Sequence, residues 1–231
     1  MNSEKIKYNC PICEKEVETN IVSNINVTLN PELKDKLFSG ELFLHECTNC
    51  QSKIQLNYSF LYHDLKNKFL ISYGTEAKYV QELIDNLQFE LSEEDFDLDQ
   101  LLKIYQVRVV RDMNDLFEKI YLFEAGLDDR VIEFCKLLIL DNAREEEKLQ
   151  AEEIIDIRYM PKDIMEEKGN IKDDVIGMNI YCEGEKAFIR TIEMPFYNQT
   201  KNYIQELAQK NQMNDELVID QAWINKLLEQ A

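Results

Sequence analysis

Two short stretches near the N-terminus decide how this chain folds: Cys10-Pro11-Ile12-Cys13 and Cys47-Thr48-Asn49-Cys50. In each stretch a tight turn can place two sulfurs a few ångströms apart. Two such turns, brought together by strands, supply four thiolates in a tetrahedral arrangement. A site closed by four sulfurs leaves no open position for catalysis, so it is structural. The sequence therefore predicts that one zinc ion is bound by Cys10, Cys13, Cys47 and Cys50.

Other roles for the cysteines and their neighbours stay open. A Cys-x-x-Cys pair can act in thiol–disulfide exchange, because the arrangement lowers the pKa of a thiol, although no strand–helix–strand pattern surrounds Cys10. His45 stands two residues before Cys47 and is a candidate hydrogen-bond donor to a ligand or a replacement ligand. Cys135 and Cys182 fall on the apolar faces of an expected helix and strand, where reduced cysteine packs as a small hydrophobe.

The composition is that of a folded protein. With 231 residues and 45% hydrophobic content, the chain can form one large or two modest domains. No apolar run reaches the roughly 18 residues of a membrane span, and residues 1–8 lack the apolar core of a signal peptide. We therefore expect a cytoplasmic protein without membrane association, whose six cysteines are reduced.

The net charge of −19 is unevenly distributed. Residues 1–75 carry 8 Lys/Arg and 9 Asp/Glu, a net of −1, whereas residues 76–231 carry 18 and 36, a net of −18. An acidic body repels a phosphate backbone, which argues against direct nucleic-acid binding. The acidity either serves solubility or forms a face for a basic protein partner.

Periodicity divides the chain into three segments and indicates an α+β fold. Residues 1–74 read as a zinc-ribbon-like antiparallel β module with an inserted helix, since Pro31 suits a helix start and Gly40 a helix end. The expected strands are 17–22, 25–29, 42–45, 54–61 and 69–73.

Residues 75–150 form an acidic, mainly helical segment, and residues 151–231 an α+β segment. Whether they make one domain or two is left open. The middle segment has a helix carrying Val80, Leu83, Ile84 and Leu87, a strand at 105–110, and helices capped by Asp112 or Asn114 and by Asp128 or Asp129. The last segment has strands at 155–160, 176–182 and 188–194, the latter two in a hairpin, then helices carrying Tyr203, Ile204 and Leu207 and carrying Trp223.

Several stretches resemble the bacterial CpXC proteins: Cys10-Pro11-Ile12-Cys13, Asn30-Pro31-Glu32-Leu33-Lys34, Ser39-Gly40-Glu41-Leu42, Cys47-Thr48-Asn49-Cys50, Leu61-Tyr62-His63-Asp64, Arg108-Val109-Val110-Arg111 and Gly126-Leu127-Asp128-Asp129-Arg130. The resemblance implies a zinc-ribbon-like module and brings no agreed activity. Members often have Pro and Gly where Thr48 and Gln51 stand here, which changes the turn propensity but keeps both thiols.

The leading hypothesis is a zinc-binding protein-interaction module with an acidic body. One alternative is an enzyme with a polar pocket around His63, Asp64, Arg108 and Asp128. For His63 and Asp64 the structural alternative is a turn or cap, because adjacent strand residues point to opposite faces. A second polar group comprises Asp128, Asp129, Arg130 and Glu133 together with Arg108 and Arg111. Its structural alternative is helix capping with salt bridges to the adjacent strand. A third hypothesis is an antitoxin-like or inhibitor-like partner that masks a basic surface; the oligomeric state is open.

Overall fold

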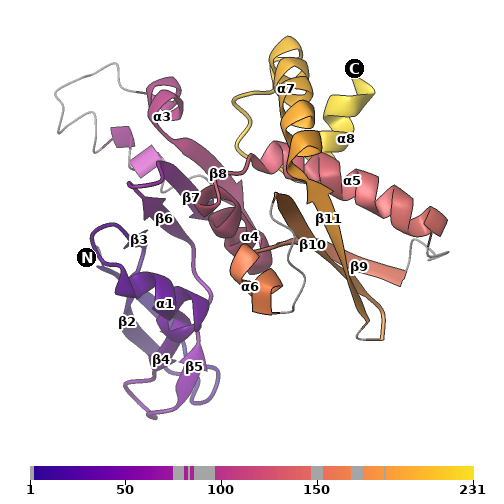
Figure 1. The fold of residues 1–231 in the computed structure, drawn as a ribbon. Coiled ribbons are helices and arrows are strands. Elements are labelled where there is room, and N and C mark those ends of the chain that lie inside the picture. Colours follow the sequence, from indigo (N-terminus) through magenta and orange to yellow (C-terminus); the bar gives the residue numbers. More distant parts are fainter. Residues whose placement is uncertain are drawn as a thin grey trace. The chain divides into compact units, whose positions relative to one another are not determined.

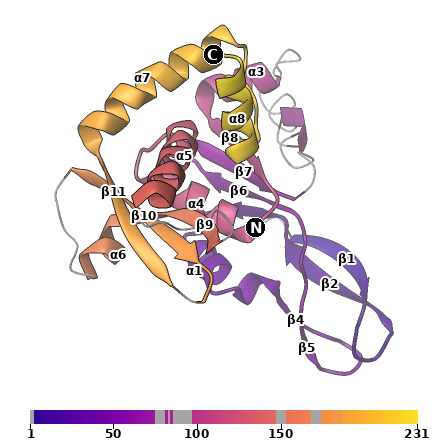
Figure 2. The ribbon, with the colours of Figure 1, turned by 90° about the vertical axis from the view of Figure 1, so that its right-hand side faces the viewer.

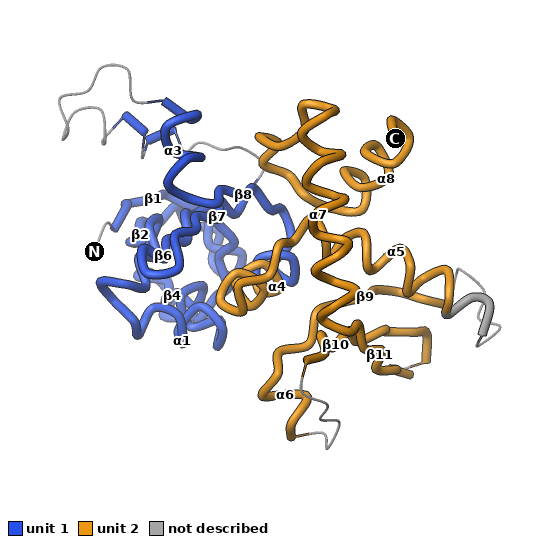
Figure 3. The backbone as a smooth tube through the Cα atoms, turned by 45° about the horizontal axis from the view of Figure 1, so that its top comes forward, with its two compact units in different colours: residues 1–116 blue, residues 117–231 orange. Residues whose placement is uncertain are grey.

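A computed structural model describes residues 3–74, 81–82, 84–85, 97–146, 153–167, 174–184 and 186–231, with the side chains of 143–146 left aside. The chain divides into two compact units, Met1–Leu116 and Phe117–Ala231, coloured separately in Figure 3. The domain boundary predicted after residue 150 lies outside the described residues, and the one after residue 74 lies at their edge. Both boundaries stay predictions.

The first unit contains two antiparallel hairpins and a separate four-stranded sheet (Figure 1). Its elements are β1 (Ser3–Asn9), β2 (Glu16–Val22), β3 (Asn24–Asn26), α1 (Glu32–Phe38), the 3-10 helix η1 (Glu41–Phe43), β4 (Leu44–Glu46), β5 (Lys53–Gln55), β6 (Phe60–Asp64), β7 (Phe69–Tyr73), α3 (Leu98–Ile104) and β8 (Gln106–Val110). β1 pairs with β2 and β4 with β5. α4 (Met113–Glu124) follows and crosses into the second unit.

The four-stranded sheet has the order β3-β6-β7-β8 and mixed directions. β3 runs parallel to β6 and β7 parallel to β8, whereas β6 and β7 are antiparallel. β8 comes from the expected middle segment and still pairs with β7. Paired residues point to the same face, so one face carries the row Ile25, Tyr62, Ile71 and Arg108, and the other carries Asn26, His63, Leu70 and Val107. Nearly all of β6 and β7 is buried, which explains their continuous apolar runs.

The structure corrects several details of the expected strands. The strand expected at 54–61 is two strands, β5 and β6, in different sheets. The strand expected at 25–29 ends at Asn26, and the one at 42–45 begins as η1. Gly40 follows α1 with a positive φ of 76°, as a helix end requires. Of the helix expected around residue 84, Ile84 is described and buried, whereas Val80, Leu83 and Leu87 lie outside the described residues.

The second unit packs helices on an antiparallel sheet of order β11-β10-β9 (Figure 2). Its elements after α4 are α5 (Asp129–Glu146), β9 (Ile154–Met160), α6 (Lys162–Glu167), β10 (Val175–Cys182), β11 (Ala187–Glu193), α7 (Met194–Lys210) and α8 (Gln221–Glu229). α5 contacts β9, α7 and α8, and α6 contacts β10. The expected hairpin is present and gains β9 as a third strand. Ile204 and Leu207 are buried as expected, but Tyr203 faces solvent.

The mixture of helices with mainly antiparallel sheets confirms the α+β class. Among the described residues, no helix is long and apolar enough to cross a membrane.

Candidate metal centre

Each Cys-x-x-Cys stretch forms the turn of a hairpin. The first lies between β1 and β2, and the second between β4 and β5. The same two backbone hydrogen bonds close both turns. The N–H of the first cysteine donates to the carbonyl five residues later, at 3.0 Å and 2.9 Å, and its carbonyl accepts the N–H four residues later, at 2.8 Å in both. The two turns are thus near copies of each other in backbone geometry.

The residue after the second cysteine has a left-handed backbone in both turns. Glu14 has a φ of 57° and Gln51 a φ of 61°. Glycine adopts this conformation without a steric cost, whereas other residues lose roughly 1–2 kcal/mol. Both turns therefore accept local strain to bring their cysteines together.

The four sulfurs converge on one point. The Sγ atoms of Cys10, Cys13, Cys47 and Cys50 all lie within 4.8 Å of one another. Between the two turns, Cys10 Sγ lies 3.8 Å from Cys50 Sγ and Cys13 Sγ lies 3.8 Å from Cys47 Sγ. A tetrahedron with metal–sulfur bonds of about 2.3 Å has edges of about 3.8 Å, so the thiols fit a four-sulfur metal site.

A family model described as CpXC protein matches residues 8–136 of the chain, which is more than half of it. The chain belongs to the CpXC family. The match includes both cysteine turns, the four-stranded sheet and the first part of α5. Searches of curated proteins and of solved structures returned no match.

Hydrogen bonds to the sulfurs lower the pKa of two thiols of this CpXC protein. The backbone of Lys15 and the side chain of Asn49 lower the pKa of Cys13. The hydroxyl and backbone of Ser52 lower the pKa of Cys50 to about 6. Cys47 receives a backbone hydrogen bond from Cys50, but burial and neighbouring thiols raise its pKa to about 11. The cluster thus already favours thiolates on its more exposed side.

His45 lies near the metal centre but outside the cluster. Its Nδ1 is 3.1 Å from the Thr19 hydroxyl, and its ring meets that of Tyr58 edge-on. Burial lowers its pKa, which keeps the imidazole neutral. Among the described residues, the group that could hold a metal ion consists of the four cysteines. The structure therefore does not place His45 as a replacement ligand.

His63 and Asp64 do not act as a pair. They lie on opposite faces of the four-stranded sheet, as strand alternation requires. Asp64 accepts the backbone N–H of Asn67 at 3.0 Å and its side-chain amide at 2.7 Å, which confirms the turn role. The ring of His63 lies edge-on to that of Tyr105. Arg108 is on the face opposite His63, and its guanidinium donates to the Val107 carbonyl at 2.7 Å.

The acidic residues at the start of α5 are capping and ion-pairing groups. Asp128 accepts the backbone N–H of Arg130 at 3.1 Å and pairs with its guanidinium at 2.7 Å. Asp129 pairs with Lys119 at 2.8 Å, with both side chains almost completely buried. The structure thus confirms helix capping for this cluster. Its ion pairs are with Arg130 and with lysines of α4 and α5, partners that the sequence analysis did not identify, whereas the expected pairing with Arg108 and Arg111 stays a prediction.

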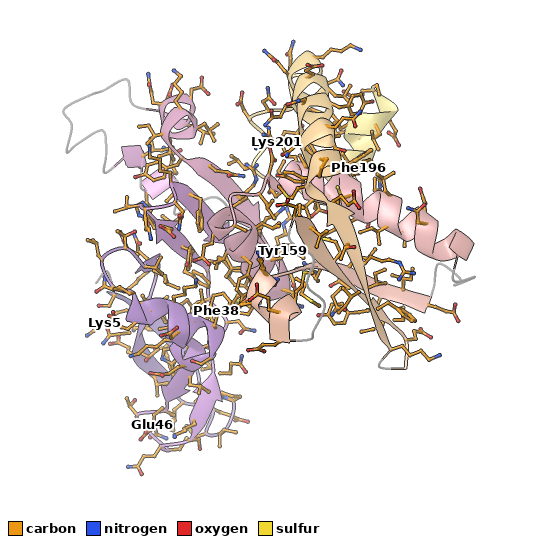
Figure 4. All side chains as sticks on the ribbon, viewed as in Figure 1. Lys5, Phe38, Glu46, Tyr159, Phe196 and Lys201 are labelled. Atoms are coloured by element: carbon orange, nitrogen blue, oxygen red, sulfur yellow. The ribbon has the colours of Figure 1, made fainter. Side chains whose placement is uncertain are left out.

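Glu118 belongs to the same buried ion network, which continues from Lys119 to Glu133 at 3.9 Å. It pairs with Lys136 at 2.7 Å and with Arg158 at 3.1 Å, and Lys136 also pairs with Glu133 at 2.9 Å. Glu118 accepts the backbone N–H of Tyr159 in β9 as well, at 2.7 Å (Tyr159 is labelled in Figure 4). Sequence reasoning missed this network. The only local signal was the spacing of Glu133 and Lys136, three residues apart on one helix.

Cys135 and Cys182 are buried, as expected. Burial raises the pKa of the Cys135 thiol to about 12, so this sulfur remains protonated at neutral pH. A protonated, buried thiol is neither a nucleophile nor a metal ligand.

Proposed function

We propose that this CpXC protein is a cytoplasmic protein-interaction module whose N-terminal hairpins are held together by one structural zinc ion. The observation that carries the proposal is the pair of 3.8 Å sulfur–sulfur distances between the two turns. Zinc is the metal that four thiolates in a tetrahedron favour. Six free thiols suit the reducing cytoplasm.

The zinc ion would provide a link that the sheets do not. The hairpins β1–β2 and β4–β5 belong to different sheets, and the sulfur cluster joins their turns. Zinc binding to small four-ligand sites contributes on the order of 10–16 kcal/mol near neutral pH. That free energy exceeds the strain of two left-handed residues several times over.

The first turn supplies the contact surface of the module. Ile12 lies between two of the ligands and is 65% exposed, beside the exposed Pro11. A bound metal would hold this apolar side chain in one position, which reduces the entropy that a partner loses on binding. The net charge of −19 favours a partner with a basic rim.

Affinity capture with matched variants tests the proposal. Tagged full-length protein is incubated at low salt with lysate of its native cells, and the retained proteins are identified by mass spectrometry. We expect one partner to be retained by the wild type and by Leu29→Asp, which changes another exposed apolar residue of the same unit. Ile12→Asp and prior removal of the metal should each abolish retention.

Two results would contradict the proposal. Capture that survives both Ile12→Asp and metal removal would place the interface elsewhere. Capture that is insensitive to Ile12→Asp but lost at moderate salt would favour the inhibitor-like alternative, since long-range charge attraction is screened within about 10 Å at 0.1 M salt.

A further inference from the structure

The four cysteines of the cluster are not equally buried. Cys10 and Cys47, the first cysteine of each turn, are 1% and 0% exposed. Cys13 and Cys50, the second of each turn, are only half-buried. An oxidant or an electrophile would therefore reach Cys13 and Cys50 first.

These two less buried cysteines are the ones whose sulfurs form a hydrogen bond with a polar side chain of the second turn. The Asn49 amide donates from the second turn across to Cys13 Sγ in the first turn, at 3.3 Å. The Cys50 thiol donates to the Ser52 hydroxyl oxygen at 3.4 Å. Once Cys50 is a thiolate it can only accept, so the Ser52 hydroxyl becomes the donor. When Cys13 and Cys50 are thiolates, each sulfur thus has a side-chain donor beside it.

The donors make the two turns chemically unequal despite their matching backbones. The positions of the first turn that correspond to Asn49 and Ser52 are Ile12 and Lys15. The isoleucine side chain has no hydrogen-bonding group, and Lys15 acts on Cys13 of its own turn through its backbone. The second turn therefore protects a sulfur of each turn, and the first turn is left free to expose an apolar side chain.

We infer that Asn49 and Ser52 are positioning residues that shield the metal-binding thiolates Cys13 and Cys50 from attack and slow the release of the metal. The inference deepens the proposed function and rests on its metal site. A hydrogen bond to a ligating sulfur withdraws electron density and fixes its orientation, and loss of such partners typically weakens metal sites by 10–100-fold. An unshielded thiolate would be alkylated or oxidised faster. The modified sulfur would no longer bind the metal as a thiolate, so the ion would dissociate.

The test measures zinc release from the full-length protein. Zinc-loaded wild type, Asn49→Ala and Ser52→Ala are treated with N-ethylmaleimide, and the released zinc is followed with a chromogenic chelator. Each variant should release zinc about tenfold faster than the wild type while binding the same amount. Ser52→Thr keeps a hydroxyl and should restore slow release. Thr48→Ala changes an equally exposed residue of the same turn and should leave the rate unchanged.

A spectroscopic readout separates shielding from a general loss of stability. In the cobalt(II)-substituted protein, loss of a hydrogen bond to sulfur should shift the sulfur-to-cobalt charge-transfer band of both variants. The tetrahedral ligand-field bands should stay in place, because the four ligands are unchanged.

Unchanged release rates and an unchanged charge-transfer band in both variants would overturn the inference and leave the metal site standing. A wild-type chain that binds no metal would overturn the proposed function together with the inference.

Discussion

At the residue scale, Gln51 stands where the turn favours glycine. Its φ of 61° costs a residue with a side chain roughly 1–2 kcal/mol, whereas glycine is free of that cost but loses more entropy on folding. We expect Gln51→Gly to raise the free energy of unfolding of the metal-loaded protein by about 0.5–1 kcal/mol. Denaturant unfolding followed by circular dichroism measures the change.

The matched control is Thr48→Gly in the same turn. Thr48 does not have a positive φ, so glycine there should lower the stability by about 0.5–1 kcal/mol. Equal effects of the two substitutions would contradict the strain assigned to Gln51.

His63 gives the fold a pH dependence. Its side chain is 8% exposed, and burial lowers its pKa below the ordinary 6.5, against an opposing effect of the neighbouring Asp64. The unfolded chain then binds the proton more readily than the folded one, so the stability contributed by neutral His63 is complete above pH 6.5 and falls as the pH drops below it. The loss cannot exceed about 1.4 kcal/mol per pH unit.

Comparison with His63→Gln isolates this effect from His45 and from acid release of a metal, since both proteins share those terms. The stability difference between the wild type and the variant should shrink as the pH falls from 7 to 5. A difference that stays constant over this range would show that His63 is not buried as a neutral group.

At the element scale, Gly177 lets α6 pack closely on β10. A Cβ atom at position 177 would lie within 3 Å of the Met165 side chain, which is itself buried. Gly177→Ala should therefore destabilise the second unit by about 1–3 kcal/mol, as overpacking does. Thermal unfolding measures the loss. Adding Met165→Ala should recover part of it, and strictly additive effects of the two substitutions would contradict direct packing.

The Glu118 network fixes α4 to α5 and to the edge of β9. Glu118→Gln keeps the shape of the side chain but removes the carboxylate charge that pairs with Lys136 and Arg158. Because breaking a buried pair leaves its partner uncompensated, we expect a loss of about 3–5 kcal/mol in denaturant unfolding. Lys226→Ala breaks the exposed pair with Glu216 and should cost at most about 1 kcal/mol. Similar losses in the two variants would contradict the distinction.

Comparison of individual helices and strands with their predictions shows which of them the sequence pattern alone can identify. α4 and α5 were predicted because Asp112 and Asp128 cap helices with clear apolar periodicity. β8 was predicted from the strand-like run at residues 105–110. β1 was not identified, since its inner face is only half-buried and its apolar alternation is limited to Ile6 and Tyr8. The single strand expected at 54–61 became two, because pattern alone cannot tell which partner a strand pairs with.

The same limit applies to the site. Spacing predicted the four cysteines, since a Cys-x-x-Cys turn brings its own sulfurs together. It could not predict that Asn49 donates to Cys13, because that contact depends on how two distant hairpins meet. Lys119 and Asp129 were not predicted as a pair for a similar reason: they come from different helices.

At the scale of the whole molecule, the two units differ in the interactions available to stabilise them: the cysteine cluster lies in the first unit and the buried ion pairs lie in the second. The first unit brings four sulfurs of its two hairpins together, whereas the second has a three-stranded sheet, packed helices and buried ion pairs. The CpXC match spans the first unit and ends early in the second, at residue 136. We therefore expect removal of a metal to unfold the hairpins while the second unit keeps its structure.

Metal analysis of the purified full-length protein tests the central claim most directly. Elemental mass spectrometry gives the zinc content, and thiol titration before and after chelation counts the protected cysteines. The structure leads us to expect one zinc per chain and four additional reactive thiols once the metal is removed. A chain without metal, whose paired cysteines are freely reactive or oxidise to disulfides, would contradict the account and favour a redox role for the two turns.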